Sequence, residues 1–141
     1  MGRQFAHRPV LSLRVGVVGH RDLKALKDFK DANIAPLKES IRKILTRISK
    51  ELGGGPSRQG YQDRPVRYFM INSLAEGSDQ LVAQVSLDAS LNYQLRCPIP
   101  FPEKVYLDNF SIDKDRSIRA FQELTTCKQF SCRKIILDAP Y

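Results

Sequence analysis

Residues suited to binding an anion follow an apolar run near the start of the sequence. The run from Leu13 to Gly19 reads Leu-Arg-Val-Gly-Val-Val-Gly, and His20 and Arg21 come directly after it. Apolar runs of this kind are typical of buried parallel strands, and open α/β sheets bind ligands beyond the carboxyl ends of their strands. A guanidinium offers a planar fork of donors that matches two phosphate oxygens. We therefore expect an anion site at Gly19, His20 and Arg21, with a surface salt bridge of Arg21 and simple packing of His20 as the alternatives.

A second polar turn follows another apolar run. Ser73 to Asp79 reads Ser-Leu-Ala-Glu-Gly-Ser-Asp and comes after the strand-like run from Val66 to Asn72. A helix that begins near Gly77 or Ser78 would direct unpaired backbone amides out of the ligand-binding edge of the sheet, where they bind phosphate or carboxylate. The alternative is an ordinary turn in which Ser78 or Asp79 only caps the helix.

The side chains of this turn suggest separate roles. Gly77 allows the backbone to approach a ligand closely, and Ser73 has a hydroxyl to donate. Glu76 and Asp79 can accept hydrogen bonds from ribose hydroxyls. The same two carboxylates are the candidates for catalysis at a glycosidic bond, where they would stabilise positive charge on the sugar.

An aromatic residue between prolines follows the third strand-like run. Phe101, between Pro100 and Pro102, could stack on a base or could cover the core. The complete set of expected ligand-binding residues is Gly19, His20, Arg21, Ser73, Ala75, Glu76, Gly77, Asp79, Pro100 and Phe101.

The elements that must position these residues alternate between strands and helices. Strands are expected at Leu13–Gly19, Val66–Asn72, Asn92–Cys97 and Lys134–Asp138. Helices are expected at Ile34–Leu52, from Gly77 or Ser78 through Ala89 and at Asp115–Cys127, and a short helix or turn is expected at Glu103–Phe110. Residues 53–65 are rich in Gly, Pro and Gln and are expected to form a mobile loop. This order predicts a Rossmann-like α/β fold of three layers, α/β/α, with a mostly parallel sheet of about four strands.

Composition bounds the class of protein. The 141 residues, 42% hydrophobic and 27% charged, are typical of one soluble globular domain. No run approaches the roughly 20 apolar residues of a membrane span, and the N-terminus lacks the apolar core of a signal peptide, so we expect a cytoplasmic protein without a membrane partner. Cys97, Cys127 and Cys132 lack zinc-site spacing, and we expect reduced thiols and no metal or other cofactor.

The formal net charge of +8 invites a nucleic-acid interpretation. Many of the basic residues, however, fall on the polar face of the helix expected at Ile34–Leu52, among acidic residues. Aromatic residues do not alternate with them, as a base-stacking surface would need. Nucleic acid is therefore a minor alternative as a partner.

Three segments together resemble a known superfamily. They are Val15 to Arg21, Asn72 to Leu81 and Pro98 to Pro102, and they are similar to segments of the Rossmann-like SLOG superfamily, named for the DNA-processing protein A and the LONELY GUY cytokinin-activating enzymes. In the DNA-processing branch the first strand ends in Val-Gly-Ser-Arg, and the second is followed by Ser-Gly-x-Ala-x-Gly-x-Asp. The resemblance covers about residues 12–138.

The resemblance implies a pocket for a nucleotide or a nucleotide derivative and favours a binding or sensing domain. Two alternatives stay open: a nucleoside monophosphate phosphoribohydrolase and a single-stranded DNA-binding domain. The phosphoribohydrolase branch has a Pro-Gly-Gly-x-Gly-Thr-x-x-Glu motif that residues 1–141 do not contain. The resemblance thus implies the N-terminal portion of a SLOG domain. We expect the exposed sheet edge to be completed by a further segment of a longer protein or by another chain. A C-terminal effector segment and a homo-oligomer are further possible partners.

Overall fold

The structure, a computed structural model, describes residues 8–23, 30–53, 65–126 and 132–137. The elements in chain order are β1 (Ser12–Gly16), the 3-10 turn η2 (Asp31–Asn33), α1 (Ile34–Gly53), β2 (Arg67–Ile71), α2 (Ser78–Ser86), β3 (Tyr93–Ile99), α3 (Glu103–Asp108), α4 (Lys114–Thr126) and β4 (Arg133–Ile136). All four strands are parallel and form one sheet in the order β1-β2-β3-β4. The expected α/β class and the parallel sheet of four strands are confirmed.

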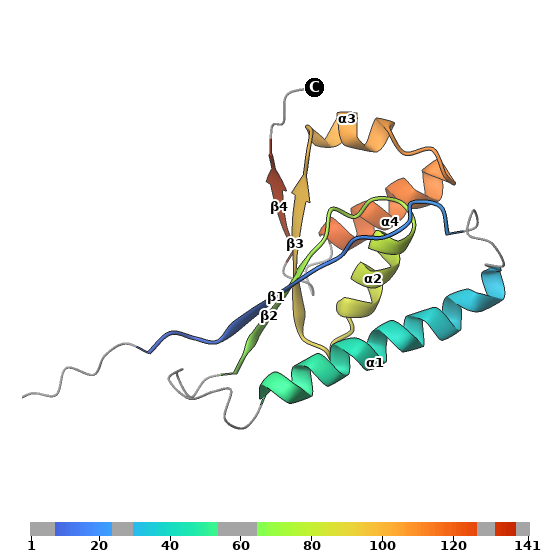
Figure 1. Cartoon of the computed structure of the whole chain (residues 1–141). Coiled ribbons are helices and arrows are strands. Elements are labelled where there is room, and N and C mark those ends of the chain that lie inside the picture. The colour runs from blue at the N-terminus through green and yellow to red at the C-terminus, as the bar shows by residue number, and fades with distance from the viewer. Residues whose placement is uncertain (1–7, 24–29, 54–64, 127–131, 138–141) are drawn as a thin grey trace, which may run out of the picture.

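The long helices lie on one face of this sheet (Figure 1). α1 packs against α2, and α2 packs against α4. Each crossover advances by one strand in the same direction, so crossovers of the same hand place every helix on the same side. The described residues therefore build two of the three expected layers, and no described helix covers the second face of the sheet.

Alternating burial along the central strands shows where the core lies. In β2, Tyr68 and Met70 are buried, whereas Arg67 is exposed and Phe69 and Ile71 are partly exposed. The side chains of β3 alternate in the same way. The core between sheet and helices is made of Leu45, Val66, Tyr68, Met70, Leu74, Ala83, Val85, Leu87, Leu91, Tyr93, Leu95, Cys97, Ile99, Tyr106, Phe110, Phe121 and Leu124.

The end of β3 corrects one expectation. This strand was expected to stop before Pro98, but it continues through Pro98 to Ile99. Backbone groups of successive residues face alternate neighbours, and the Ile99 carbonyl accepts from Leu137 on the β4 side, so Pro98 faces the β2 side. The last residue pair between β2 and β3 is Ile71 with Arg96. Pro98 thus lies past β2, where its missing N–H costs no ladder bond.

The end of α2 corrects another. Ala89 was expected on this helix, but α2 ends at Ser86. The Asp88 carboxylate accepts hydrogen bonds from the backbone N–H and the hydroxyl of Ser90, and the Leu91 N–H donates to the Asp88 carbonyl. This local bonding favours a turn over another turn of helix.

Other expectations lie partly outside the described residues. Residues 54–64 of the expected loop at 53–65 are not described, nor is Cys127. Cys97 and Cys132 are free thiols, and burial raises the pKa of Cys97 to about 12. Within the described ranges, no cluster of three His, Cys, Asp or Glu side chains could hold a metal ion, and no helix is both long and apolar enough to cross a membrane.

Candidate functional site

The two polar turns meet at the carboxyl ends of β1 and β2. The Ser78 backbone N–H donates to the His20 carbonyl at 3.0 Å, and the Ser78 hydroxyl donates to the same oxygen at 2.9 Å. This contact occupies the first amide of α2 with protein rather than leaving it for a ligand. It places the turn after β1 directly against the start of α2, as the parallel arrangement predicts.

Two glycines make this approach possible. A Cβ atom on Gly19 would lie 2.0 Å from the Ser78 Oγ. Gly77 has a φ of +86°, and a Cβ atom there would lie 2.0 Å from the Arg21 carbonyl oxygen. Side chains larger than hydrogen would therefore force the turns apart.

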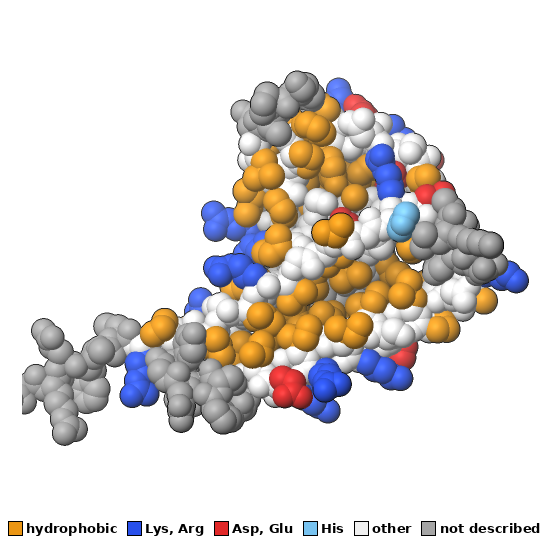
Figure 2. Space-filling view, in the orientation of Figure 1, with side chains coloured by type: hydrophobic (Ala, Val, Ile, Leu, Met, Phe, Trp, Pro, Cys, Tyr) orange, Lys and Arg blue, Asp and Glu red, His pale blue; other side chains and the backbone are white. Residues whose placement is uncertain are grey.

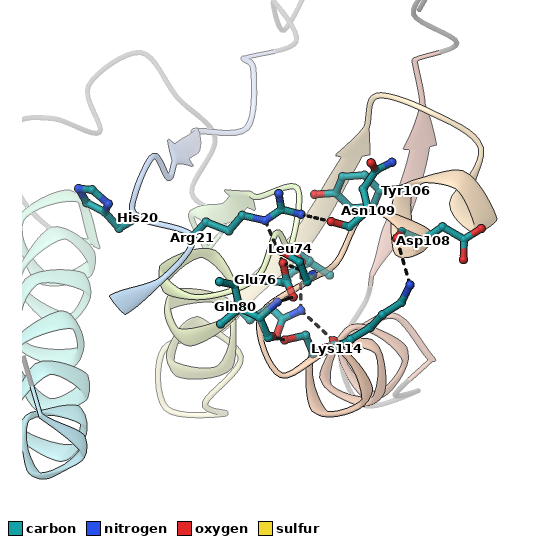
Figure 3. Close-up of polar contacts among 12 residues, drawn as sticks. His20, Arg21, Leu74, Glu76, Gln80, Tyr106, Asp108, Asn109 and Lys114 are labelled. Carbon is teal, nitrogen blue, oxygen red and sulfur yellow. Dashed lines mark hydrogen bonds and ion pairs between the residues drawn. The ribbon is translucent and has the colours of Figure 1, made fainter. Parts of the chain in front are cut away.

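The Glu76 carboxylate joins three segments of the chain at this edge. Its side chain is 1% exposed, and it accepts hydrogen bonds from the Arg21 Nε at 2.9 Å, the Ser111 N–H at 3.0 Å and the Ile112 N–H at 2.7 Å. Arg21 also donates from its Nη2 to the Asn109 carbonyl (Figure 3). The salt bridge considered as the alternative for Arg21 is thus present, although its carboxylate is buried. The Glu76 carboxylate holds the Arg21 guanidinium in place by this ion pair.

Asp79 lies in a second polar group beside this pair. The Ser73 hydroxyl donates to the Asp79 carboxylate at 3.1 Å, and the Ala75 N–H also bonds to that carboxylate. The Asn72 side chain donates to the Asp79 carbonyl at 2.7 Å. Burial raises the pKa of Asp79, and the two bonds to its carboxylate oppose that shift only in part.

A pocket of about 560 Å³ opens over these residues. It is lined by Val17, Val18, Gly19, Arg21, Ser73, Ala75, Glu76, Asp79, Phe101, Tyr106, Asn109 and Phe110. Its volume lies within the range of small-molecule sites, and its place at the carboxyl ends of parallel strands is where α/β sheets bind ligands.

Most of the expected site residues line this pocket, but three do not. The exposed His20 side chain points away from the Arg21–Glu76 pair (Figure 3), and its contribution is the carbonyl that Ser78 contacts. Gly77 and Pro100 are also absent from the lining. Phe101 lines the pocket and packs against the core as well, so both alternatives considered for it describe part of its environment.

Sequence reasoning missed the wall of the pocket that the segment after β3 supplies. Tyr106, Asn109 and Phe110 line the pocket, and the Tyr106 hydroxyl donates to the Ser73 carbonyl at 3.1 Å. Burial raises the pKa of Tyr106. The expected helix at Glu103–Phe110 follows a strand directly, so its start had to lie at the carboxyl edge; that signal was present in the element order.

A second cavity, of about 380 Å³, lies on the helical side of the same turns. Its lining includes Gln80, whose Nε2 already donates to the Leu74 carbonyl at 3.2 Å and to the Ser117 carbonyl at 2.9 Å. Its lining also includes Leu23 and Asp31, and the structure does not describe the residues between Leu23 and Lys30. We therefore assign the candidate site to the pocket at the strand ends.

Comparisons with known proteins neither add to nor oppose this assignment. No protein-family model matches the chain, and no curated protein matches it either.

Replacing Gly77 tests how closely the two turns must approach. Gly77→Ala is expected to lower the free energy of unfolding by about 2 kcal/mol or more, because the backbone conformation is unfavourable for alanine and the Cβ meets a carbonyl oxygen. Gly16→Ala is the matched control, because a Cβ at Gly16 has nothing within 4 Å. Urea unfolding compares them, and equal losses for the two variants would contradict the close contact.

Replacing Glu76 tests its supporting role. Glu76→Gln should destabilise the fold by about 2 kcal/mol, because the amide NH2 must face a donor where the carboxylate accepted hydrogen bonds. The control is Glu39→Gln, which removes a carboxylate that is 51% exposed and paired with Arg42 on the surface; it should cost no more than about 0.5 kcal/mol. Similar unfolding midpoints for both variants would argue against an anchoring role.

Asp79 should make stability depend on pH. Because burial raises the pKa of Asp79 in the folded protein above its ordinary value of 3.8, its favourable contribution to stability is full below pH 3.8 and is lost as pH rises through the folded pKa. Asp79→Asn should therefore gain stability relative to the unmodified protein between pH 4 and pH 7. Urea unfolding across this range measures the difference, with the exposed Asp108→Asn variant as the control for removing one negative charge. A difference that is constant or shifts the other way would refute the burial effect.

Proposed function

We propose that this chain binds a nucleotide or nucleotide-derived molecule in the pocket at the carboxyl ends of β1, β2 and β3, and that it acts as a binding or sensing domain. The observation that carries this proposal is the convergence of the two expected polar turns on one pocket of about 560 Å³. Aromatic, cationic and acceptor groups line it together, which is the mixture a base, a phosphate and a sugar require.

Arg21 is the residue that would hold the phosphate. Its side chain is 49% exposed, and Glu76 and Asn109 engage only its Nε and one side of the guanidinium. Because the Nε is held by Glu76 and the Nη2 donates to Asn109, the remaining N–H groups of the guanidinium are available to the pocket that Arg21 lines. A preoriented guanidinium binds an anion with less loss of conformational entropy than a mobile side chain does.

The opposite parts of the pocket suit the remaining groups of a nucleotide. Phe101 and Tyr106 offer aromatic surface for a base. Ser73 and Asp79 offer a hydroxyl and a carboxylate for sugar hydroxyls. The resemblance to the SLOG superfamily supports the same class of ligand.

Binding is favoured over catalysis by the state of the acidic groups. Glu76 is 1% exposed, and its carboxylate accepts hydrogen bonds from three donors of the protein. These bonds occupy the carboxylate oxygens that a catalytic role would need. Of the two carboxylates considered for glycosidic-bond cleavage, Asp79 is the one not paired with a cation in the described residues. The phosphoribohydrolase alternative therefore depends on Asp79 together with groups that residues 1–141 do not supply.

Direct binding measurements test the proposal. AMP, GMP, cyclic AMP and ADP-ribose are titrated into the full chain by calorimetry, with thermal shift as a second readout. A ligand at 100 times its dissociation constant adds about 2.7 kcal/mol, enough to raise the unfolding midpoint by several degrees. The corresponding nucleoside should bind at least tenfold more weakly. Absence of binding by all four compounds would count against the proposal.

A pair of arginine variants locates the phosphate. Arg21→Lys keeps a positive charge beside Glu76 but loses the fork, and we expect a tenfold or greater loss of nucleotide affinity. Arg119→Lys is the control, because Arg119 is exposed on α4 and does not line the pocket. Equal affinity of both variants would exclude Arg21 as the phosphate ligand. Circular dichroism establishes that each variant is folded before titration.

A further inference from the structure

The face of the sheet opposite the helices carries a defined set of side chains. Side chains alternate along a strand, and paired residues of parallel strands point to the same side. Arg14 pairs with Phe69, and Ile71 pairs with Arg96, which pairs in turn with Arg133. We call this surface the bare face, and it comprises Ser12, Arg14, Gly16, Arg67, Phe69, Ile71, Gln94, Arg96, Pro98, Arg133, Ile135 and Leu137.

The bare face is apolar enough to need a cover. Ile135 is 41% exposed and Leu137 is 58% exposed. All-parallel sheets occur almost only with both faces covered. Ile135 pairs with the partly exposed Pro98, and exposed apolar side chains that neighbour one another mark an interaction site.

The bare face is also strongly basic. Four arginines lie on it, and none of the described strand residues of β1 to β4 is Asp or Glu. Figure 2 shows basic and hydrophobic side chains together along the side of the sheet away from the helices, at the left of the view. The cover must therefore be apolar at its centre and acidic at its margins.

These charges argue against a second copy of the chain as the cover. Two bare faces packed together would bring arginines against arginines. The exposed side of α1 from a second copy is also basic, because Lys43, Arg47 and Lys50 are exposed on it. Like charges across an interface cost several kcal/mol, so neither surface complements the bare face.

The aromatic group of the bare face does not suit stacked bases. The Arg96 guanidinium lies 4.7 Å from the centre of the Phe69 ring, and the Arg14 guanidinium lies 5.8 Å from it. The ring is thus already engaged by cations, whereas a single-stranded nucleic acid would require an open ring for stacking. The aliphatic residues Ile71, Ile135 and Leu137 offer nothing to phosphates.

We propose that the bare face docks an amphipathic helix of a partner protein whose apolar stripe is flanked by Asp and Glu residues. The apolar stripe covers Phe69, Ile71, Ile135 and Leu137, and the acidic flanks pair with the arginines. A helix packed on this side supplies the second helical layer that a parallel sheet requires.

Synthetic peptides test whether the bare face prefers a helix with acidic flanks. One peptide of about 20 residues carries a leucine stripe flanked by glutamates, and a second has lysine at every glutamate position. We expect the glutamate peptide to bind the full chain and to gain helicity by circular dichroism, with an affinity at least tenfold above that of the lysine peptide and reduced by salt. Equal binding of the two peptides would overturn the proposal.

Charge-matched variants locate the binding site. Arg14→Gln/Arg133→Gln should lower the affinity for the glutamate peptide at least tenfold. Lys43→Gln/Arg47→Gln, which removes the same charge from α1, should leave that affinity unchanged. Ile135→Ser/Leu137→Ser should also weaken binding, which separates apolar docking from simple charge attraction. Equal losses for the two charge variants would overturn the assignment to the bare face.

Two competing occupants are measured alongside. Tighter binding of an oligothymidylate than of the glutamate peptide, lost in Arg14→Gln/Arg133→Gln, would assign the face to nucleic acid instead. Dimerisation in sedimentation velocity that Ile135→Ser/Leu137→Ser abolishes would assign it to a second copy. Either result would replace the proposed partner helix.

Discussion

The buried Glu76 carboxylate is the interaction on which the carboxyl edge of the sheet depends. Burial of a carboxylate is unfavourable unless charged and hydrogen-bonding partners replace water, and here Arg21 and two backbone N–H groups do so. Those three donors come from the turn after β1 and from the turn that precedes α4. One side chain therefore links the connection after β1 to the connection before α4. The pocket over them keeps its shape because this charge is satisfied inside the protein.

Close packing of the two turns is the second constraint. Gly19 and Gly77 let the Ser78 amide and hydroxyl reach the His20 carbonyl, and this contact fills the start of α2. An anion at this edge consequently meets a guanidinium beside the helix rather than the first helix amide itself. The proposed ligand binding in this pocket would therefore depend on side chains, whose geometry is more specific than that of a bare helix N-terminus.

The sequence allowed the strand and helix order and the two facing turns to be predicted, because periodicity and chain direction decide both. The engagement of Glu76 could not be predicted, because its donors Ser111 and Ile112 lie 35 and 36 residues further along the chain, in a connection without periodic pattern. The continuation of β3 through Pro98 depended on where β2 ends, which is a property of the assembled sheet. The one-sided helical layer likewise follows from the strand order, which local patterns do not contain.

The pocket and the bare face meet at the end of β1. Val18 lines the pocket and is fully exposed, two residues beyond the last residue of β1. A helix docked on the bare face near this end would shield Val18 and raise one wall of the pocket. Exclusion of water there would strengthen the interaction of Arg21 with an anion, since charge interactions grow as the local dielectric constant falls. The two proposals are thus physically coupled. By linkage, a ligand that binds more tightly when the helix is docked would also raise the affinity of the chain for the partner helix.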